Sequence, residues 1–533
     1  MEGIIRLLRN DRRGVSNVLV VMLSLVLITV IVANVILWSY QMNQFDWEKS
    51  QEKIEISNFC DESPWLKCSP YWKFWEKDNI YETFTEENAP QNREFYPFQV
   101  NLLAGTQIVE GSINDLTADD NSHIIFRSYE ASGIKKGAFI AYRSNTGTFG
   151  SSSPKARTWD GEAASWGPEE ELPNAGDPVV WVRVAYCPLQ NRAYEKIVVT
   201  LLESGDYNVY VWNGTQWLIF SNIGYNAYTS YYRSFDVAYE KSYGRALIVY
   251  SRGTAMDGYE IGYRIWDGNN LSDEYLLDLT YTYGIVHWIS LATAPGTRPG
   301  TADDNEIAMI YLDSNRDVQG YIWNGSSWSD MGAASVWDSS AATYSRECIA
   351  VAYEQISGRA MFIWGHLSYG YYYYDYYNYY RIWDGSALSD PLSLRIAAQG
   401  GITYWVTLKP NPVSNGLMFV AIDSGRDLNT AYWDGTSWTI HNEHDWSVDT
   451  SAQRCADFAW EPDGNRGLLV WGTSYGAISY KIFTIPNTWS PPYTASAAGT
   501  HRWVQLKTNT QNIEGDIRIL GAVLNSNYDI GVI

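Results

Sequence analysis

The chain has few charged residues, few histidines and few cysteines for its length. Only 18% of its 533 residues are charged, six are histidine and five are cysteine. Lys and Arg number 38 against 60 Asp and Glu, which gives a formal net charge of −22. A nucleic-acid-binding protein needs a basic surface that releases counterions from phosphates. The shortage of basic residues therefore argues against a nucleic-acid partner.

The sequence also lacks the short motifs of common catalytic and cofactor sites. No nucleophile is paired with a base, and no phosphate-binding loop or dinucleotide fingerprint is present. His441 and His444 lie close together, but in a predicted loop, without a helix to orient both rings towards one metal. The turns 313–317 and 423–427 carry alternate carboxylates, yet they lack the glycine and the glutamate of a calcium loop. The sequence predicts no enzyme, no cofactor and no metal site, although it leaves calcium dependence open.

Aromatic residues, by contrast, are abundant and recur in one short motif. The chain has 25 Trp and 41 Tyr, a composition that favours pleated sheet over helix. The segment Tyr432–Trp438 (YWDGTSW) has close copies at Tyr210–Trp217 and Tyr321–Trp328. Asp-Gly or Asn-Gly between aromatic runs predicts a β-hairpin with a type I′ turn, in which both central residues have positive φ.

The motif repeats with a period that predicts a β-propeller. Its first tryptophan falls about 50 to 60 residues after the previous one, at Trp159, Trp212, Trp266, Trp323, Trp383 and Trp433. Such a period, with several short strands in each unit, is typical of four-stranded propeller blades. The fold class expected from the sequence is therefore all-β.

The repeats alternate between two types from about Phe98 onward. One type opens with a Trp-centred strand, as at 180–186, 287–291, 404–408 and 502–506, and the other opens as at 235–240, 349–354 and 457–461. A ring of alternating types closes without a mismatch only if their number is even, so eight blades are favoured over seven. The last unit has three predicted strands, and Val100–Val109 is placed to supply the fourth. Alternatively, the sequence ends within an incomplete unit.

A basic segment and a long apolar run precede the repeats. Four arginines lie within residues 1–14, and the run Val18–Tyr40 is long enough to span a bilayer. The basic flank places the N-terminus in the cytoplasm and the large domain outside. We therefore expect a transmembrane helix that extends to about residue 45, a stalk at 46–97 and the propeller at 98–533.

The segment Arg12-Arg13-Gly14-Val15-Ser16-Asn17-Val18, followed directly by the apolar run, resembles the class III signal of archaeal type IV pilins and archaellins. The resemblance implies that a prepilin peptidase recognises Arg12 and Arg13 and cuts after Gly14. Residues 1–14 would then be a leader, and the mature chain would begin at Val15 with the transmembrane helix 15–45. It also implies that the helix anchors the protein in the membrane and packs with other pilin-like subunits in a pilus. The alternative is an ordinary single-span anchor in which Arg-Arg-Gly is incidental.

The cysteines fall into two groups. Cys60 and Cys68 lie close together before the repeats and are candidates for a disulfide if the segment is extracellular. Cys348 and Cys455 occupy matching places in two repeats where another copy has Phe235. An exchange with Phe indicates small buried hydrophobic residues rather than ligands.

Nine tyrosines are concentrated between Tyr369 and Tyr380. Tyr371, Tyr373, Tyr376 and Tyr379 are candidate ligand-binding aromatics, because exposed rings stack on sugars or on a protein partner. The alternative is a long hairpin that packs on the neighbouring blade.

Taken together, these patterns predict a pilin-like, membrane-anchored extracellular β-propeller that binds a glycan or protein ligand at the cell surface. The rival is a cell-surface glycan-processing hydrolase on the same scaffold. Non-repeating Asp, Glu, Tyr and Arg gathered at one end of the propeller channel would favour the hydrolase, and a shallow aromatic groove would favour binding.

Overall fold

The chain divides into two units, Met1–Pro90 and Gln91–Ile533. The computed structural model describes residues 111–113, 123–128, 136–143, 153–160, 165–226, 232–253, 259–279, 284–298, 304–369, 374–396, 401–496, 500–508, 518–525 and 530–532. The predicted leader, transmembrane helix, stalk and Cys60–Cys68 pair lie outside these residues, as does Val100–Val109. Within the described ranges, no helix has the length and apolar character needed to cross a membrane.

The described strands form eight sheets, each of four or five antiparallel strands. The first four sheets contain β2 (His123–Ser128), β3 (Lys136–Tyr142), β4 (Lys155–Asp160), β5 (Ser165–Trp166) and β6 (Glu170–Glu171); β7 (Val179–Tyr186), β8 (Lys196–Leu202), β9 (Tyr207–Trp212) and β10 (Trp217–Phe220); β11 (Phe235–Tyr239), β12 (Ala246–Ser251), β13 (Ile261–Trp266) and β14 (Tyr275–Leu277); and β15 (Val286–Thr293), β16 (Ile307–Asp313), β17 (Val318–Trp323) and β18 (Trp328–Ser329). A 3₁₀ turn, Gln190–Arg192, joins β7 to β8.

The other four sheets contain β19 (Ile349–Tyr353), β20 (Ala360–Tyr369), β21 (Tyr374–Trp383) and β22 (Leu392–Leu394); β23 (Thr403–Pro410), β24 (Leu417–Asp423), β25 (Leu428–Trp433) and β26 (Trp438–Asp445); β27 (Ala456–Trp460), β28 (Arg466–Gly472), β29 (Ala477–Thr484), β30 (Thr488–Trp489) and β31 (Tyr493–Ser496); and β32 (His501–Thr508), β33 (Ile519–Asn525) and β34 (Ile530–Val532), which β1 (Gly111–Ile113) completes. We call the first strand of each sheet its inner strand, and we call the sheets beginning with β2, β11, β19 and β27 odd and those beginning with β7, β15, β23 and β32 even.

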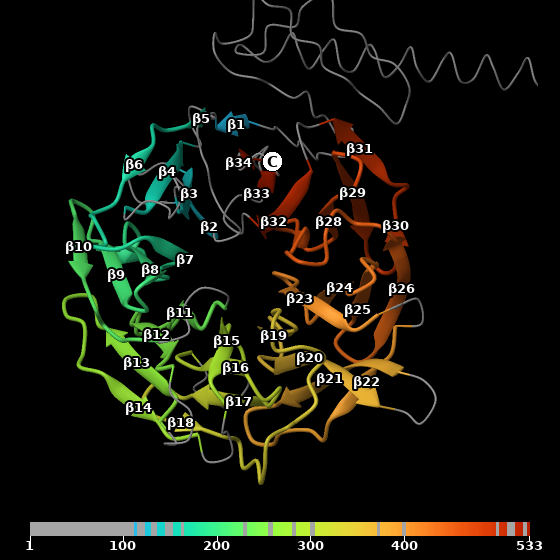
Figure 1. Cartoon of the computed structure of the whole chain (residues 1–533), viewed down its shortest axis with the longest axis horizontal. Helices are drawn as coiled ribbons and strands as arrows, with labels where there is room; N and C mark the ends of the chain where they lie inside the picture. Colours follow the sequence, from blue (N-terminus) through green and yellow to red (C-terminus); the bar gives the residue numbers. More distant parts are fainter. Residues whose placement is uncertain are drawn as a thin grey trace, which may run out of the picture. The chain divides into compact units, whose positions relative to one another are not determined.

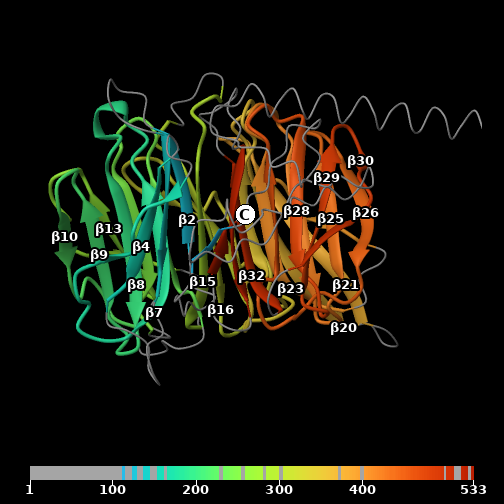
Figure 2. The same cartoon turned by 90° about the horizontal axis from the view of Figure 1, so that it is seen from above.

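The inner strands contact one another in a closed ring. Each touches the inner strand of the next sheet, from β2 through β7, β11, β15, β19, β23 and β27 to β32, which contacts β2 again. Figure 1 shows the inner strands around an axis with the fourth strands at the rim, and Figure 2 shows the strands side-on. This is the arrangement of a β-propeller, so the all-β class and the propeller prediction are confirmed.

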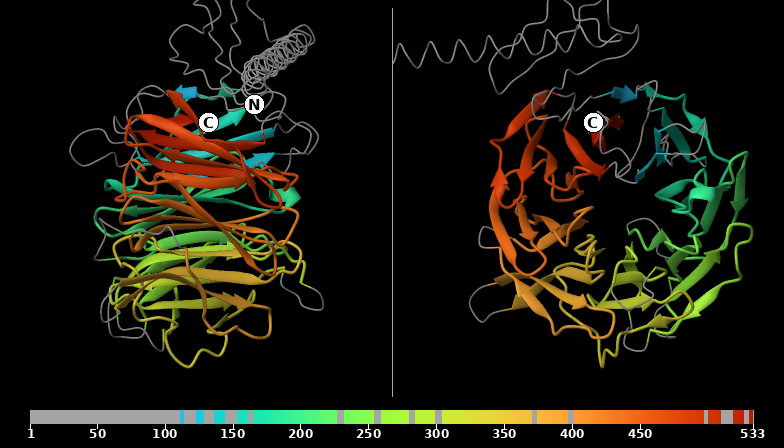
Figure 3. Two further views of the ribbon diagram at one scale, coloured as in Figure 1. Left: turned by 90° about the vertical axis from the view of Figure 1, so that its right-hand side faces the viewer. Right: turned by 180° about the vertical axis from the view of Figure 1, so that it is seen from behind.

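The final sheet is completed by a strand from the other end of the propeller sequence. Gly111 pairs with Val532 and Ile113 with Ile530, so β1 lies at the outer edge beside β34. The two views of Figure 3 show β1 beside the C-terminal strands. A closing strand from the N-terminal side was expected, but the strand that does this is Gly111–Ile113.

The repeated aromatic motif forms the hairpin between the third and fourth strands. Trp433 pairs directly with Trp438 across a four-residue loop. Only the glycine of this loop, Gly435, has a positive φ, of 102°, so the predicted type I′ turn is wrong. The carboxylate of Asp434 instead accepts hydrogen bonds from the backbone N–H groups of Thr436 and Ser437, at 2.7 and 2.8 Å. The side chain of Asp434 thus stabilises a loop in which only one residue has a positive φ, whereas a type I′ turn needs two.

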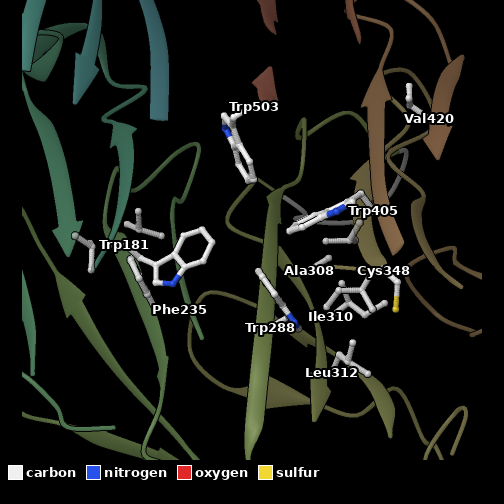
Figure 4. Close-up of a cluster of buried hydrophobic side chains, with 14 of the residues drawn as sticks. Trp181, Phe235, Trp288, Ala308, Ile310, Leu312, Cys348, Trp405, Val420 and Trp503 are labelled. Carbon is white, nitrogen blue, oxygen red and sulfur yellow. The ribbon is translucent and has the colours of Figure 1, made fainter. Parts of the chain in front are cut away.

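Four tryptophans meet at the axis, one from each even inner strand: Trp181, Trp288, Trp405 and Trp503. We call them the tryptophan ring. A β-bulge immediately before each one shifts the register of its strand and directs the indole inward. Successive indoles pack edge to face, with centroids 5.9, 5.8 and 5.8 Å apart for three of the pairs. Figure 4 shows the four side chains converging, and all are at most 6% exposed.

Hydrophobic packing alternates around the propeller as the sequence types do. Each interface from an odd sheet to the following even sheet has its own cluster, as between β19–β22 and β23–β26, where Ile363 and Phe419 belong to one core. The interfaces from even to odd sheets share one continuous cluster, which includes the tryptophan ring. The two repeat types therefore correspond to two kinds of interface.

In two odd sheets, those beginning with β11 and β19, a buried carboxylate fastens the sheet to the Trp motif of the next sheet. Glu240, at the end of β11, accepts two hydrogen bonds from Arg245, at 2.6 and 2.7 Å, and one from the indole of Trp323, at 2.7 Å. Arg245 also donates to the carbonyl of Gly325 in the same Trp-Asn-Gly turn, at 2.6 Å. We call this arrangement the glutamate latch.

The latch recurs two sheets later with nearly the same geometry. Glu354 accepts from Arg359 at 2.7 and 2.8 Å and from Trp433 at 2.7 Å, and Arg359 donates to the carbonyl of Gly435 at 2.6 Å. The recurring arginines, Arg245 and Arg359, are thus structural. The Trp-Asp-Gly motif is the half of the latch supplied by the next sheet.

Substitution of Glu354 by Ala should lower the free energy of unfolding by about 3 kcal/mol, because it leaves a guanidinium and an indole N–H without their buried acceptor. The measurement is the urea midpoint of the full-length protein. Glu443→Ala, which removes an exposed glutamate from β26, is the matched control. Equal losses for the two variants would contradict the role of the latch.

Candidate functional site

A cavity of about 480 Å³ lies on the propeller axis among the inner strands. Its described walls come from β7, β11, β15, β19, β23 and β32 and from the segments just before β11, β19 and β27. Its charged and polar lining side chains include Arg183, Arg233, Asp236, Lys241, Ser290, Glu347, Thr407, Lys409, Arg454, Gln505 and Lys507. The size lies within the range of small-molecule sites.

Cationic side chains outnumber acidic ones in this lining. The described walls contribute six cations and two acids, Asp236 and Glu347. This composition is the reverse of that of the whole chain, whose formal net charge is −22. The axis is therefore a local centre of positive charge in an acidic protein.

The acids at the axis are all held by cations. Asp236 lies 3.5 Å from the guanidinium of Arg183 and 3.7 Å from that of Arg233, which also pairs with Glu347. Behind the wall, the buried carboxylate of Asp457 accepts from Lys409 at 2.8 Å. Each of these carboxylates therefore has a cationic partner.

Two cations of the lining, Arg454 and Lys507, make neither an ion pair nor a side-chain hydrogen bond among the described residues, although acids such as Asp457 act on both over a longer distance. The side chain of Arg454, which is 7% exposed, lies over the face of Trp503 at 4.6 Å, and its Nε is buried and unpaired. Burial lowers the pKa of Lys507 to about 8. The Oε1 atom of Gln505, on the same side of β32, is also buried without a partner.

The polar residues at the axis do not repeat, although their strands do. Two residues after its tryptophan, each of the four even strands has a different residue: Arg183, Ser290, Thr407 or Gln505. Four residues after the tryptophan, the strands have Ala185, Ala292, Lys409 and Lys507. The tryptophans themselves are identical. In a repeat fold the scaffold positions recur, so variation at positions that face one cavity marks them as functional candidates.

The predicted tyrosine site is only partly described. Tyr371 and Tyr373 lie outside the described residues, and Tyr376 is in β21 opposite Leu367. The ring of Tyr379 packs on Trp364 at 6.3 Å and edge-on to His366 at 4.7 Å. The neighbouring Tyr380 packs on two tryptophans of the adjacent sheet. For Tyr379 and Tyr380, the alternative of packing within and between sheets fits the contacts.

The structure reveals two exposed aromatic residues that the sequence did not single out. Trp446 is 74% exposed and Tyr475 is 88% exposed. Their loops adjoin, because Val448 bridges to Thr473 and the hydroxyls of Ser447 and Ser474 lie 3.4 Å apart. Exposed rings on adjoining loops are a surface on which sugars stack.

His441 and His444 are both held by a hydrogen bond to Thr430. They were expected in a loop, but both lie in strand β26. The hydroxyl of Thr430 contacts His441 Nδ1 at 3.3 Å and His444 Nε2 at 2.7 Å, and burial lowers the pKa of His444 to about 3. In the part of the chain that the structure describes, no group of three or more His, Cys, Asp or Glu is placed to hold a metal.

The matching aspartates of the turns use their carboxylates on the backbone. Asp313 accepts from the N–H groups of Asn315 and Asp317, both at 2.8 Å, and Asp423 accepts from that of Asp427 at 2.9 Å. Arg316, in the first turn, has a positive φ of 70°. These carboxylates stabilise tight turns, and burial raises the pKa of Asp313 to about 7.

The repeated cysteines are buried thiols, but the expected alignment with Phe235 is wrong. Cys348 and Cys455 are 0% exposed and donate to the carbonyls of Thr343 and Thr450. The backbone of Ser234 makes the same hydrogen bonds as theirs, so the third copy has a serine here. A thiol and a hydroxyl can exchange at this position because both are small.

The variant Asp313→Asn should change how stability depends on pH. Because burial raises the pKa of Asp313, the folded state binds more protons than the unfolded state between about pH 4 and 7, and stability falls as pH rises through this window. The variant should lose part of this slope in thermal unfolding measured across the window. A slope identical to that of the wild type would contradict the assignment.

Neither a protein-family model nor a curated protein matches the chain. Among solved structures, it is similar to the BP39L lectin from Burkholderia pseudomallei, with 11% identity over 72% of this chain and all of the lectin, at a TM-score of 0.48. The Dos1 propeller matches 79% of this chain and 93% of its own length at 11% identity and a TM-score of 0.47. The fucose-recognising lectin from Aleuria aurantia, a six-bladed propeller, matches 62% and 97% at 12% identity and a TM-score of 0.35.

Proposed function

We propose that the protein is a cell-surface binding protein: a pilin-like N-terminal segment anchors it in the membrane, and an extracellular, eight-bladed propeller binds a small ligand or a terminal group of a glycan in its central cavity. The observation that carries the binding function is the cavity itself, whose walls combine repeating scaffold residues with polar side chains that differ from sheet to sheet. The eight sheets and their ring of inner strands support the blade number.

The alternative of a glycan-processing hydrolase has one observation in its favour, because non-repeating acids and arginines do gather at the axis. Their bonding favours binding instead. Asp236 and Glu347 are engaged by Arg183 and Arg233. The hydroxyl of Tyr239, which also lines the cavity, donates to Glu195 at 2.8 Å, away from these acids. No described acid of the lining is thus left without a cation, as a general acid or base would require.

Filling the cavity should abolish binding. The full-length protein in detergent would be tested on an array of neutral and acidic glycans, and Ala292→Trp, in the wall formed by β15, should lose at least tenfold in affinity for any ligand found. Trp446→Ala, at the exposed loops, should bind as the wild type does. The reverse pattern would place binding at the loops, no ligand at all would overturn the binding function, and shortened glycan products would favour the hydrolase.

The anchoring part of the proposal is supported by the sequence Arg12-Arg13-Gly14-Val15 before the apolar run. Protein isolated from its native membranes should begin at Val15, as determined by N-terminal sequencing and intact mass. Gly14→Ile should leave the leader in place, because a bulky residue would occupy the position at which the peptidase cuts. A wild-type chain that retains Met1 would refute the pilin-like processing and leave an ordinary single-span anchor.

A further inference from the structure

We propose that the central cavity recognises its ligand through an oxyanion, a carboxylate, phosphate or sulfate group on a small organic molecule, held by Arg454 and Lys507. This inference rests on the binding function proposed above and specifies the chemistry of the ligand. The two cations come from neighbouring sheets, just before β27 and on β32, and both line the cavity.

Arg454 is the strongest single indication. A guanidinium stays charged under all ordinary conditions, and burying a charge without a partner is costly. The side chain is 7% exposed and one face is covered by Trp503. The neighbouring acid, Asp457, is taken by Lys409 and by the backbone N–H of Leu506, both at 2.8 Å. The forked N–H donors of Arg454 are therefore available to an oxyanion, whose geometry they match.

Lys507 and Gln505 extend the same surface along β32. Residues at alternate positions of a strand lie on one side of it, so Trp503, Gln505 and Lys507 all face the axis. The unpaired Oε1 of Gln505 adds an acceptor for a hydroxyl or amine of the ligand. An oxyanion in the cavity would be attracted by both Arg454 and Lys507, which line it.

Repulsion among the cations supports the same conclusion. Burial, followed by repulsion from Arg233, lowers the pKa of Arg183 to about 9, and Arg454 contributes in the same direction. Lys507 experiences similar repulsion from Lys409. Cations held near one another in a partly buried site are favourable when an anion binds between them.

The remaining walls suit the body of a small molecule. Val184, Ala185, Val351, Ala352 and Leu408 give the cavity apolar surface. Ligand sites typically combine such surface with a few placed polar groups. The cavity therefore has an anion-binding side and apolar walls.

The test compares three probes that share one sugar ring and differ at its sixth carbon: glucuronate, glucose 6-phosphate and glucose. Binding to the full-length protein would be measured by titration calorimetry at pH 7 and low salt. At least one of the two acids should bind ten or more times more tightly than glucose. Added salt should weaken the binding of that acid. Binding of glucuronate alone would identify a carboxylate, and binding of the phosphate alone would identify a phosphoryl group.

Arg454→Gln and Lys507→Gln should each lower the affinity for the acid at least tenfold and leave the affinity for glucose unchanged. Arg395→Gln, which alters an exposed arginine outside the cavity, is the control. Arg454→Lys should recover only part of the affinity because it lacks the fork, and the thermal unfolding of every variant would verify folding. The affinity of the wild type should also fall above about pH 8, as Lys507, which faces Arg183, Asp236, Lys409 and Asp457, loses its proton.

Equal binding of glucose and both acids, insensitive to the variants, would overturn the oxyanion inference and leave the cavity as a binding site for a neutral ligand. Failure of both acids to bind at millimolar concentration would also overturn it. The binding function itself would fall only if the glycan array found no ligand, so the two failures are distinguishable.

Discussion

The buried glutamate latch is the interaction on which the rest of this propeller depends. A propeller sheet cannot bury its faces alone, and its neighbours must be held at a fixed rotation for the inner strands to meet at the axis. Hydrophobic packing is non-directional, whereas a carboxylate such as Glu240 or Glu354, shared between an arginine and an indole, has one geometry. The latch therefore sets the angle between sheets that apolar contact alone leaves adjustable.

The alternation of two repeat types acquires a physical meaning in this arrangement. Interfaces from odd to even sheets carry separate apolar clusters, and two of them, from β11 to β15 and from β19 to β23, carry the glutamate latch. Those from even to odd sheets merge through the tryptophan ring into one core. The molecule is thus better regarded as four pairs of sheets, each pair joined within itself and all four joined at the axis. The axial residues that depart from this fourfold pattern are the ones that give the cavity its charge.

The sequence was sufficient to predict the sheets but not the site. Periodic tryptophans and turn residues are local signals, so the hairpin at Trp433 and the ring of repeats could be predicted from spacing. The turn type was wrong because the side chain of Asp434 supplies hydrogen bonds that a type I′ turn would obtain from the backbone. Arg454 and Lys507 line one cavity only when β27 and β32 pack, and no single segment shows that. Aligning the four Trp-centred strands would have revealed the variable positions 183, 290, 407 and 505.

The closure of the ring has a mechanical consequence. Among the described residues, β1 is the first element that follows the N-terminal segment, and it holds the final sheet through the pairing of three residues, Gly111 to Ile113, with β34. If the propeller is held by a ligand while the chain before it is pulled, the load reaches the ring at this short strand. The load that the ring can carry would then be limited by the rupture of a few backbone hydrogen bonds at the rim, far from the axis.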